Sequence, residues 1–213
     1  MIQKFSKKEA INFGWDISKK NFRFFILLFT LVVVVFIILS FIQSLVNEKS
    51  LLSLILYIIN IVVQIIISMG LVKISLKFCD NEKPKISDLF SSYPLFFKFL
   101  IGSIIYGLIV IGGLILLIIP GIIWAIQFQF FAYLILDKGI SPIEALKKSS
   151  KITKGTKWDL FLFGILLGFI NILGALAFLV GLFVTIPATM IATAFVYRKL
   201  LSQEESFKET QSL

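Results

Sequence analysis

Long uncharged, apolar segments alternate with short basic segments along this chain. Residues 24–46 and 51–72 form two such segments of 23 and 22 residues, and only four residues separate them. Each is long enough to cross a hydrocarbon core of ~30 Å as a helix that rises ~1.5 Å per residue. The pattern therefore predicts two transmembrane helices joined as a hairpin.

Two later uncharged segments are longer. One lies between Lys98 and Asp137, the other lies between Asp159 and Arg198, and each contains 38 residues. A single helix of that length would reach ~57 Å, nearly twice the hydrocarbon thickness. Each segment is therefore predicted to fold back through a tight or re-entrant turn. The residues that mark these turns are Gly112, Gly113, Pro120 and Gly121 in the first segment, and Gly181 and Pro187 in the second.

Composition supports a membrane protein. Hydrophobic residues make up 58% of the 213 residues and the mean hydropathy is +0.99, which leaves too little polar surface to face water. The predicted fold class is all-α: a polytopic membrane bundle of six transmembrane helices arranged as three hairpins, in a single domain over residues 1–213. Basic and acidic residues interleave over the first 23 residues, so no secretory signal peptide is expected there.

The basic residues gather on one side of this arrangement. Of the 21 Lys and Arg residues, 20 lie in residues 1–23, 73–98, 138–157 and 198–213, and only Lys49 lies in a connection on the other side. Because basic connections stay in the cytoplasm, both termini are predicted to be cytoplasmic. The net charge of +9 then faces anionic lipid headgroups, and no nucleic-acid partner is expected.

Two of the connections begin with the same motif, in which Ser6 is followed by Glu9 and Ser141 by Glu144. In such a capping box the serine side chain accepts from the third backbone amide and the glutamate reaches back, so an amphipathic connector helix is predicted to begin at each serine. Further residues match between different parts of the chain at constant sequence offsets. These matches predict three repeat units, residues 1–78, 79–137 and 138–203, followed by a polar tail, residues 204–213.

The connector over residues 142–154 separates an apolar arc, which includes Ala145, Leu146 and Ile152, from a basic arc. We expect this helix to lie in the membrane interface with its apolar arc in lipid. An ordinary connector with a solvated charged face is the alternative. The candidate contacts to anionic lipid are Lys147, Lys148, Lys151 and Lys154.

The polar residues inside the predicted spans are mostly amides and hydroxyls. Such groups usually form hydrogen bonds between helices, although they could instead line a polar path for a solute. A path would require them to converge on one cavity. The candidate intramembrane polar residues are Asn60, Gln64, Gln127, Gln129 and Asn171.

Residues for catalysis or metal binding are scarce. Histidine is absent, Cys79 is the only cysteine, and no ionisable residue lies in the middle of a predicted span. No phosphate-binding loop, dinucleotide fingerprint or zinc ligand set is present. We therefore predict no catalytic, cofactor-binding or metal-binding residue, and we expect the protein not to be an enzyme.

Motifs at the turns and connectors resemble a known group. Ile119-Pro120-Gly121, Asp137-Lys138-Gly139, Glu144-Ala145-Leu146-Lys147 and Gly14-Trp15 resemble those of uncharacterised bacterial membrane proteins, a group that includes the membrane domain fused to some glycerophosphodiester phosphodiesterases. The resemblance implies a bacterial plasma (inner) membrane protein without an assigned activity. It carries no catalytic residue to this chain.

These observations favour a non-enzymatic scaffold or accessory membrane component that works through membrane lipids, a protein partner or a second copy of the chain. The alternative is a small facilitator or a lipid-handling transporter. A polar cavity that reaches the bilayer midplane would favour the alternative, whereas a dry, packed interior would favour the scaffold.

Overall fold

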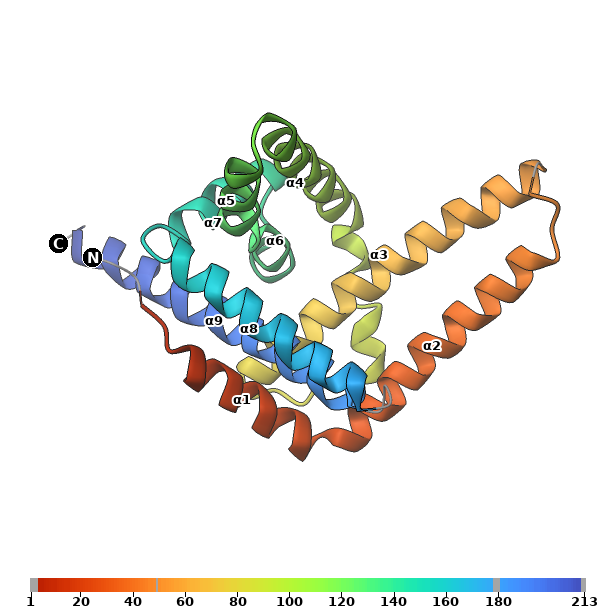
Figure 1. Ribbon diagram of the computed structural model, residues 1–213, viewed down its shortest axis with the longest axis horizontal. Helices are drawn as coiled ribbons and strands as arrows, with labels where there is room; N and C mark the ends of the chain where they lie inside the picture. The colour runs from red at the N-terminus through yellow and green to blue at the C-terminus, as the bar shows by residue number, and fades with distance from the viewer. Residues whose placement is uncertain (1–3, 49, 178–180, 212–213) are drawn as a thin grey trace.

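The computed structural model describes residues 4–48, 50–177 and 181–211, and every regular element in them is helical (Figure 1). This confirms the predicted all-α fold with six helical segments that are long and apolar enough to cross a membrane. These segments are Phe22–Ser44, Leu51–Cys79, Ile86–Leu116, Ile118–Lys138, Lys157–Leu176 and Leu182–Phe207.

The first hairpin consists of α2 (Phe22–Ser44) and α3 (Leu51–Cys79). Near its tip the Gln43 amide donates to the Ser53 hydroxyl at 2.9 Å, which ties the two helices together where they meet the connecting turn. Lys49, the single basic residue that the charge pattern placed on the far side, lies outside the described residues.

The second hairpin is entered through two short 3-10 turns, η1 (Ile86–Leu89) and η2 (Tyr93–Leu95). It consists of α4 (Phe96–Leu116), α5 (Ile118–Phe128) and α6 (Phe131–Lys138).

This second hairpin reverses at Leu117, the residue between α4 and α5. A Cβ atom on Gly113 would lie only 2.8 Å from the Gly121 Cα, so these two glycines let the helices approach closely beside the turn. Pro120 is not at the reversal itself. It lies in the first turn of α5, where its missing N–H is not needed.

The third hairpin follows α7 (Pro142–Ile152) and consists of α8 (Lys157–Leu176) and α9 (Leu182–Gln211). Pro187, which the sequence offered as a turn marker, lies inside α9 instead. Membrane helices tolerate such a proline because neighbouring groups satisfy the freed carbonyl. The reversal therefore precedes Leu182, and residues 178–180 within it are outside the described part of the chain.

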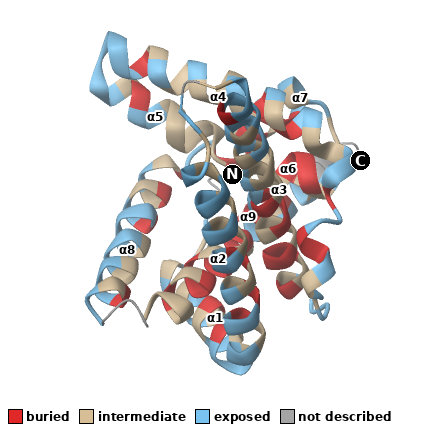
Figure 2. Ribbon diagram, turned by 90° about the vertical axis from the view of Figure 1, so that its right-hand side faces the viewer, coloured by how far each residue is buried: buried red, intermediate tan, exposed pale blue. Residues whose placement is uncertain are grey.

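The helix α9 forms the centre of the molecule, and in Figure 2 the buried residues gather around α9, α6 and the adjoining end of α3. Its side chains Ile191, Val196, Tyr197 and Leu200 are fully buried. Because α9 contacts α2 and α3 of the first hairpin and α8 of the third, and its Tyr197 hydroxyl donates to Asp137 of α6 in the second, this helix links the three hairpins.

The helix α1 (Lys7–Lys20) packs lengthwise on α9. Ala10, Gly14 and Ser18 form its buried face, and a Cβ atom on Gly14 would lie 2.1 Å from the Ala188 carbonyl oxygen. The predicted serine cap is confirmed, since the Glu9 N–H donates to the Ser6 hydroxyl at 3.2 Å. The inner face of this connector helix is therefore covered by α9.

The first hairpin diverges from the rest of the molecule. Phe25 of α2 contacts Phe78 near the end of α3, Phe29 contacts Phe183, and the Cys79 thiol lies 3.8 Å from the Ile191 carbonyl oxygen. The helix α9 therefore passes across the base of this hairpin, whose far half projects away from the other helices (Figure 1).

Candidate functional site

Gln127 is part of a structural junction. Its amide donates to the Ser150 hydroxyl at 2.7 Å and its side-chain oxygen accepts from Lys157. Its backbone carbonyl accepts from the hydroxyls of Ser149 and Thr153 at 3.0 and 3.1 Å. Because these contacts join α5, α7 and the start of α8, Gln127 positions α7 against the hairpins.

Two other amides also bind within the chain. The Gln129 amide donates to the Ile126 carbonyl at 3.0 Å. The Asn171 amide donates to the Thr189 hydroxyl at 3.2 Å, which links α8 to α9, while the Asn171 side-chain oxygen is buried without a partner among the described residues. The Asn171 bond therefore contributes to helix packing, whereas the Gln129 bond is local to the end of α5.

Asn60 and Gln64 are the exceptions. Asn60 is half-buried, Gln64 is exposed, and neither side chain has a hydrogen-bond partner in the described chain. Both lie in α3, between Ser53 near the hairpin tip and Ile67, which is buried in the same cluster as Ile191 of α9. The five predicted amides are therefore distributed over separate places, and none of them lines the groove between α1, α8 and α9 or the shallow groove along α2.

The four lysines of the predicted basic arc, of which Lys154 follows the end of α7, differ in their surroundings. Lys147, Lys151 and Lys154 are exposed, whereas Lys148 lies 3.4 Å from the Glu205 carboxylate. The apolar arc is not available to lipid, because Ala145, Leu146 and Ile152 are buried in the protein core at 0%, 5% and 0% exposure. The expectation that this arc enters the membrane is wrong, while lipid contact by the lysines stays a prediction.

An ion cluster that the sequence analysis did not identify connects three helices. The Arg198 guanidinium lies 2.6 Å from an Asp80 carboxylate oxygen and 2.7 Å from an Asp137 carboxylate oxygen. The Tyr197 hydroxyl donates to the same Asp137 oxygen at 2.9 Å. The signal was present, because Asp137 and Arg198 end the two long uncharged segments, but nothing in the sequence paired them.

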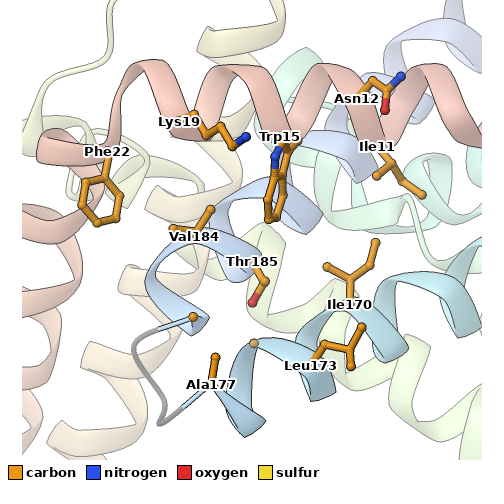
Figure 3. Close-up of a pocket in the computed structure, with 12 residues that line it drawn as sticks. Ile11, Asn12, Trp15, Lys19, Phe22, Ile170, Leu173, Ala177, Val184 and Thr185 are labelled. Carbon is orange, nitrogen blue, oxygen red and sulfur yellow. The ribbon is translucent and has the colours of Figure 1, made fainter.

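A groove of about 880 Å³ lies between α1, the end of α8 and the start of α9 (Figure 3). Its walls are mainly apolar, and its polar side chains are Asn12, Lys19 and Thr185 together with the indole of Trp15. The Lys19 ammonium lies 5.1 Å from the centroid of the Trp15 ring, a distance at which a cation is attracted to an aromatic face.

The groove also fixes how α1 relates to the third hairpin. The charge pattern placed Lys19 on the cytoplasmic side and the α8–α9 turn on the opposite side, yet Lys19, Ala177 and Gly181 line the same groove. The basic end of α1 therefore lies beside Ala177 and Gly181, the described residues at the ends of the α8–α9 connection, and both should be on the same side of the membrane.

The chemistry of these sites is that of binding and packing. In the described residues no group of three or more His, Cys, Asp or Glu side chains could hold a metal ion. Six apolar helical segments, of which the largely buried α9 is the central one, define the class: this is a polytopic α-helical membrane protein.

The family follows from sequence comparison. The profile of a domain of unknown function (DUF7847) matches residues 95–204, just over half of the chain, and the chain belongs to this family. The matched region begins before α4 and continues into α9, so it includes the second and third hairpins and the α7 connector.

Two curated relatives are also uncharacterised proteins, Mb2590 of Mycobacterium bovis and MT2637 of Mycobacterium tuberculosis. Each is 28% identical to this chain over 131 residues, which cover 62% of this chain and 40% of the relative. The chain therefore matches less than half the length of these relatives. No solved structure matches it. Resemblance to an uncharacterised bacterial family is confirmed, and these comparisons give no link to glycerophosphodiester phosphodiesterases.

Proposed function

We propose that this protein is a non-enzymatic membrane scaffold, with both termini in the cytoplasm of a bacterial cell, that assembles with a second copy of itself through α3. The observation that carries the proposal is a polar stripe on the projecting hairpin whose two amides have no partner in the described chain.

The stripe occupies one side of α3. At ~100° per residue, its members fall within an arc of about 80°. At the tip Ser53 is bound by Gln43, and further along Tyr57 is 61% exposed and the Ser68 hydroxyl donates only to its own helix at Ile65. The stripe consists of Ser53, Tyr57, Asn60, Gln64 and Ser68.

The middle of the stripe needs a partner. An amide that faces hydrocarbon without a hydrogen bond is unfavourable, because lipid supplies neither donors nor acceptors. Asn60 and Gln64 each carry both a donor and an acceptor, so the same stripe on a second copy is complementary to them. A two-fold symmetric contact would satisfy both copies at once.

The apolar surface of the same hairpin supports an assembly role. Its far half exposes large side chains, including Ile37 at 62%, Phe41 at 63% and Leu51 at 75%, and it projects away from the other helices (Figure 1). The exposed apolar surface of this hairpin must therefore be covered by lipid or by another hairpin.

Cross-linking tests the proposal directly. In a Cys79→Ser background, Gln64→Cys is expected to form a disulfide-linked dimer in membranes under mild oxidation. The matched control is Ile59→Cys. The Ile59 side chain is 42% exposed, but it lies about 140° around the helix from Gln64. Equal cross-linking at both positions, or none at Gln64→Cys, would contradict assembly through the stripe.

Affinity gives a second readout. Replacing both amides, Asn60→Leu with Gln64→Leu, removes hydrogen bonds of about 0.6–2 kcal/mol each and is expected to weaken dimerisation in bilayers by at least about tenfold. Asn171→Leu is the control, because its partner Thr189 is in the same chain, and it should leave dimerisation unchanged. If the double variant lost a solute flux instead of dimerisation, the facilitator alternative would replace the scaffold.

A further inference from the structure

We propose that the groove between α1, α8 and α9 binds one anionic glycerophospholipid, with an acyl chain along its apolar walls and the headgroup at Lys19. This site uses none of the stripe residues on α3, so it stands or falls separately from the scaffold role.

The walls of the groove suit a hydrocarbon chain. Side chains from three helices form them, and the volume of about 880 Å³ is within the range of about 300–1,000 Å³ that is usual for small-molecule sites. Figure 3 shows α1 along one side of the opening, with α8 and the start of α9 on the other. The apolar wall residues are Ile11, Phe22, Ile170, Leu173, Ala177 and Val184.

Glycines shape the floor of the groove. A Cβ atom on Gly174 would lie 2.3 Å from the Thr185 hydroxyl oxygen, and one on Gly181 would lie 2.5 Å from the Gly174 carbonyl oxygen. Only glycine at both positions lets α8 and α9 approach this closely. The groove is therefore bounded below by a close contact between two helices.

A buried hydroxyl in the groove is left without a partner. Thr185 is 6% exposed, lines the groove, and its hydroxyl oxygen has no hydrogen-bond partner among the described residues. A buried hydroxyl without a partner is destabilising. That oxygen lies against Gly174 in the floor of the groove, so Thr185 belongs to the α8–α9 contact beneath the acyl chain and makes no headgroup contact.

The charge at the opening selects an anionic headgroup. Lys19 is exposed, and the neighbouring cations Lys20 and Arg23 are exposed too; none of the three is in an ion pair with a described carboxylate. They directly precede and begin α2, where a membrane helix enters the headgroup layer. A zwitterionic lipid brings its own ammonium group, so it gains less from these cations than an anionic lipid does.

The experiment uses Trp15 as the reporter, because it lines the groove. In a Trp124→Phe, Trp158→Phe background, the full chain is placed in nanodiscs of unlabelled zwitterionic lipid with increasing amounts of brominated phosphatidylglycerol or brominated phosphatidylcholine. We expect brominated phosphatidylglycerol to quench Trp15 fluorescence at several-fold lower mole fraction. Native mass spectrometry should retain one phosphatidylglycerol per chain.

Two variants test the assigned residues against matched controls. Lys19→Gln is expected to weaken the phosphatidylglycerol effect about fivefold, the contribution of one lysine near anionic lipid, whereas Lys20→Gln, which does not line the groove, should change it less. Val184→Phe should abolish saturable quenching by filling the groove. The proposal would be overturned by equal quenching with both lipids or by equal losses in the two lysine variants. It would also be overturned if a brominated fatty acid quenched Trp15 and the brominated phospholipid did not.

Discussion

Arg198 joins three helices that are far apart in the sequence. Its guanidinium contacts Asp80 at the end of α3 and Asp137 near the end of α6, while Tyr197 reinforces the second contact. The Asp137 side chain is only 13% exposed and that of Arg198 is 26% exposed. Water therefore solvates these two charges poorly, and each depends on the other as its partner. The cluster therefore holds the bases of all three hairpins together.

Removing this guanidinium should be destabilising. Arg198→Met leaves two carboxylates without their shared partner, and we expect the free energy of unfolding in detergent, measured by titration with SDS, to fall by about 2 kcal/mol. The control is Lys199→Met, whose 3.8 Å contact with Glu9 is half-exposed and should contribute at most about 0.5 kcal/mol. Similar losses in both variants would mean that the Arg198 cluster has no special role.

The residue scale also marks a limit of sequence reasoning. Hydropathy located Gln127 and Asn171 in the apolar segments, with helix packing or a polar path as their possible roles. The identity of their partners, such as Thr189 for Asn171, depends on which helices become neighbours in space. Periodicity along one helix carries no information about that.

At the scale of elements, the helices and their starts were predictable while their partners were not. The serine caps at Ser6 and Ser141 and the amphipathic character of α1 and α7 follow from local spacing. An apolar arc needs cover, but the sequence does not distinguish lipid from protein as the cover. In both helices the cover is protein, provided by α9 for α1 and by the core for α7.

The contact between α1 and α9 can be tested at Gly14. Because a Cβ atom there would meet the Ala188 carbonyl oxygen, Gly14→Ala is expected to lower the free energy of unfolding by about 1–3 kcal/mol and to speed trypsin cleavage after Lys19 and Lys20. Gly168→Ala on α8 is the control, since nothing lies within 4 Å of its added Cβ atom; it should be neutral or slightly stabilising. Unchanged cleavage in Gly14→Ala would show that α1 does not pack on α9.

At the scale of the whole molecule, the three hairpins differ although their apolar segments look alike. The tip of α2–α3 carries polar residues, including Asn47, Glu48 and Ser50, which suit an aqueous face. The tip of α4–α5 instead exposes Ile115 at 80% and Ile118 at 70%. Counting apolar segments predicted the number of hairpins, but it could not show that α9 crosses the base of the first one.

Labelling with a membrane-impermeant maleimide tests the arrangement of these hairpins in the bilayer most directly. In a Cys79→Ser background, Glu48→Cys should be labelled from outside intact expressing cells, and Lys154→Cys only after the membrane is opened. Leu182→Cys should also resist labelling from outside, because the α8–α9 turn lies beside the basic end of α1. The first hairpin is therefore predicted to cross the membrane, with its base on the cytoplasmic side together with α1, α8 and α9. This arrangement would be contradicted if Lys154→Cys or Leu182→Cys were labelled in intact cells, or if Glu48→Cys were protected.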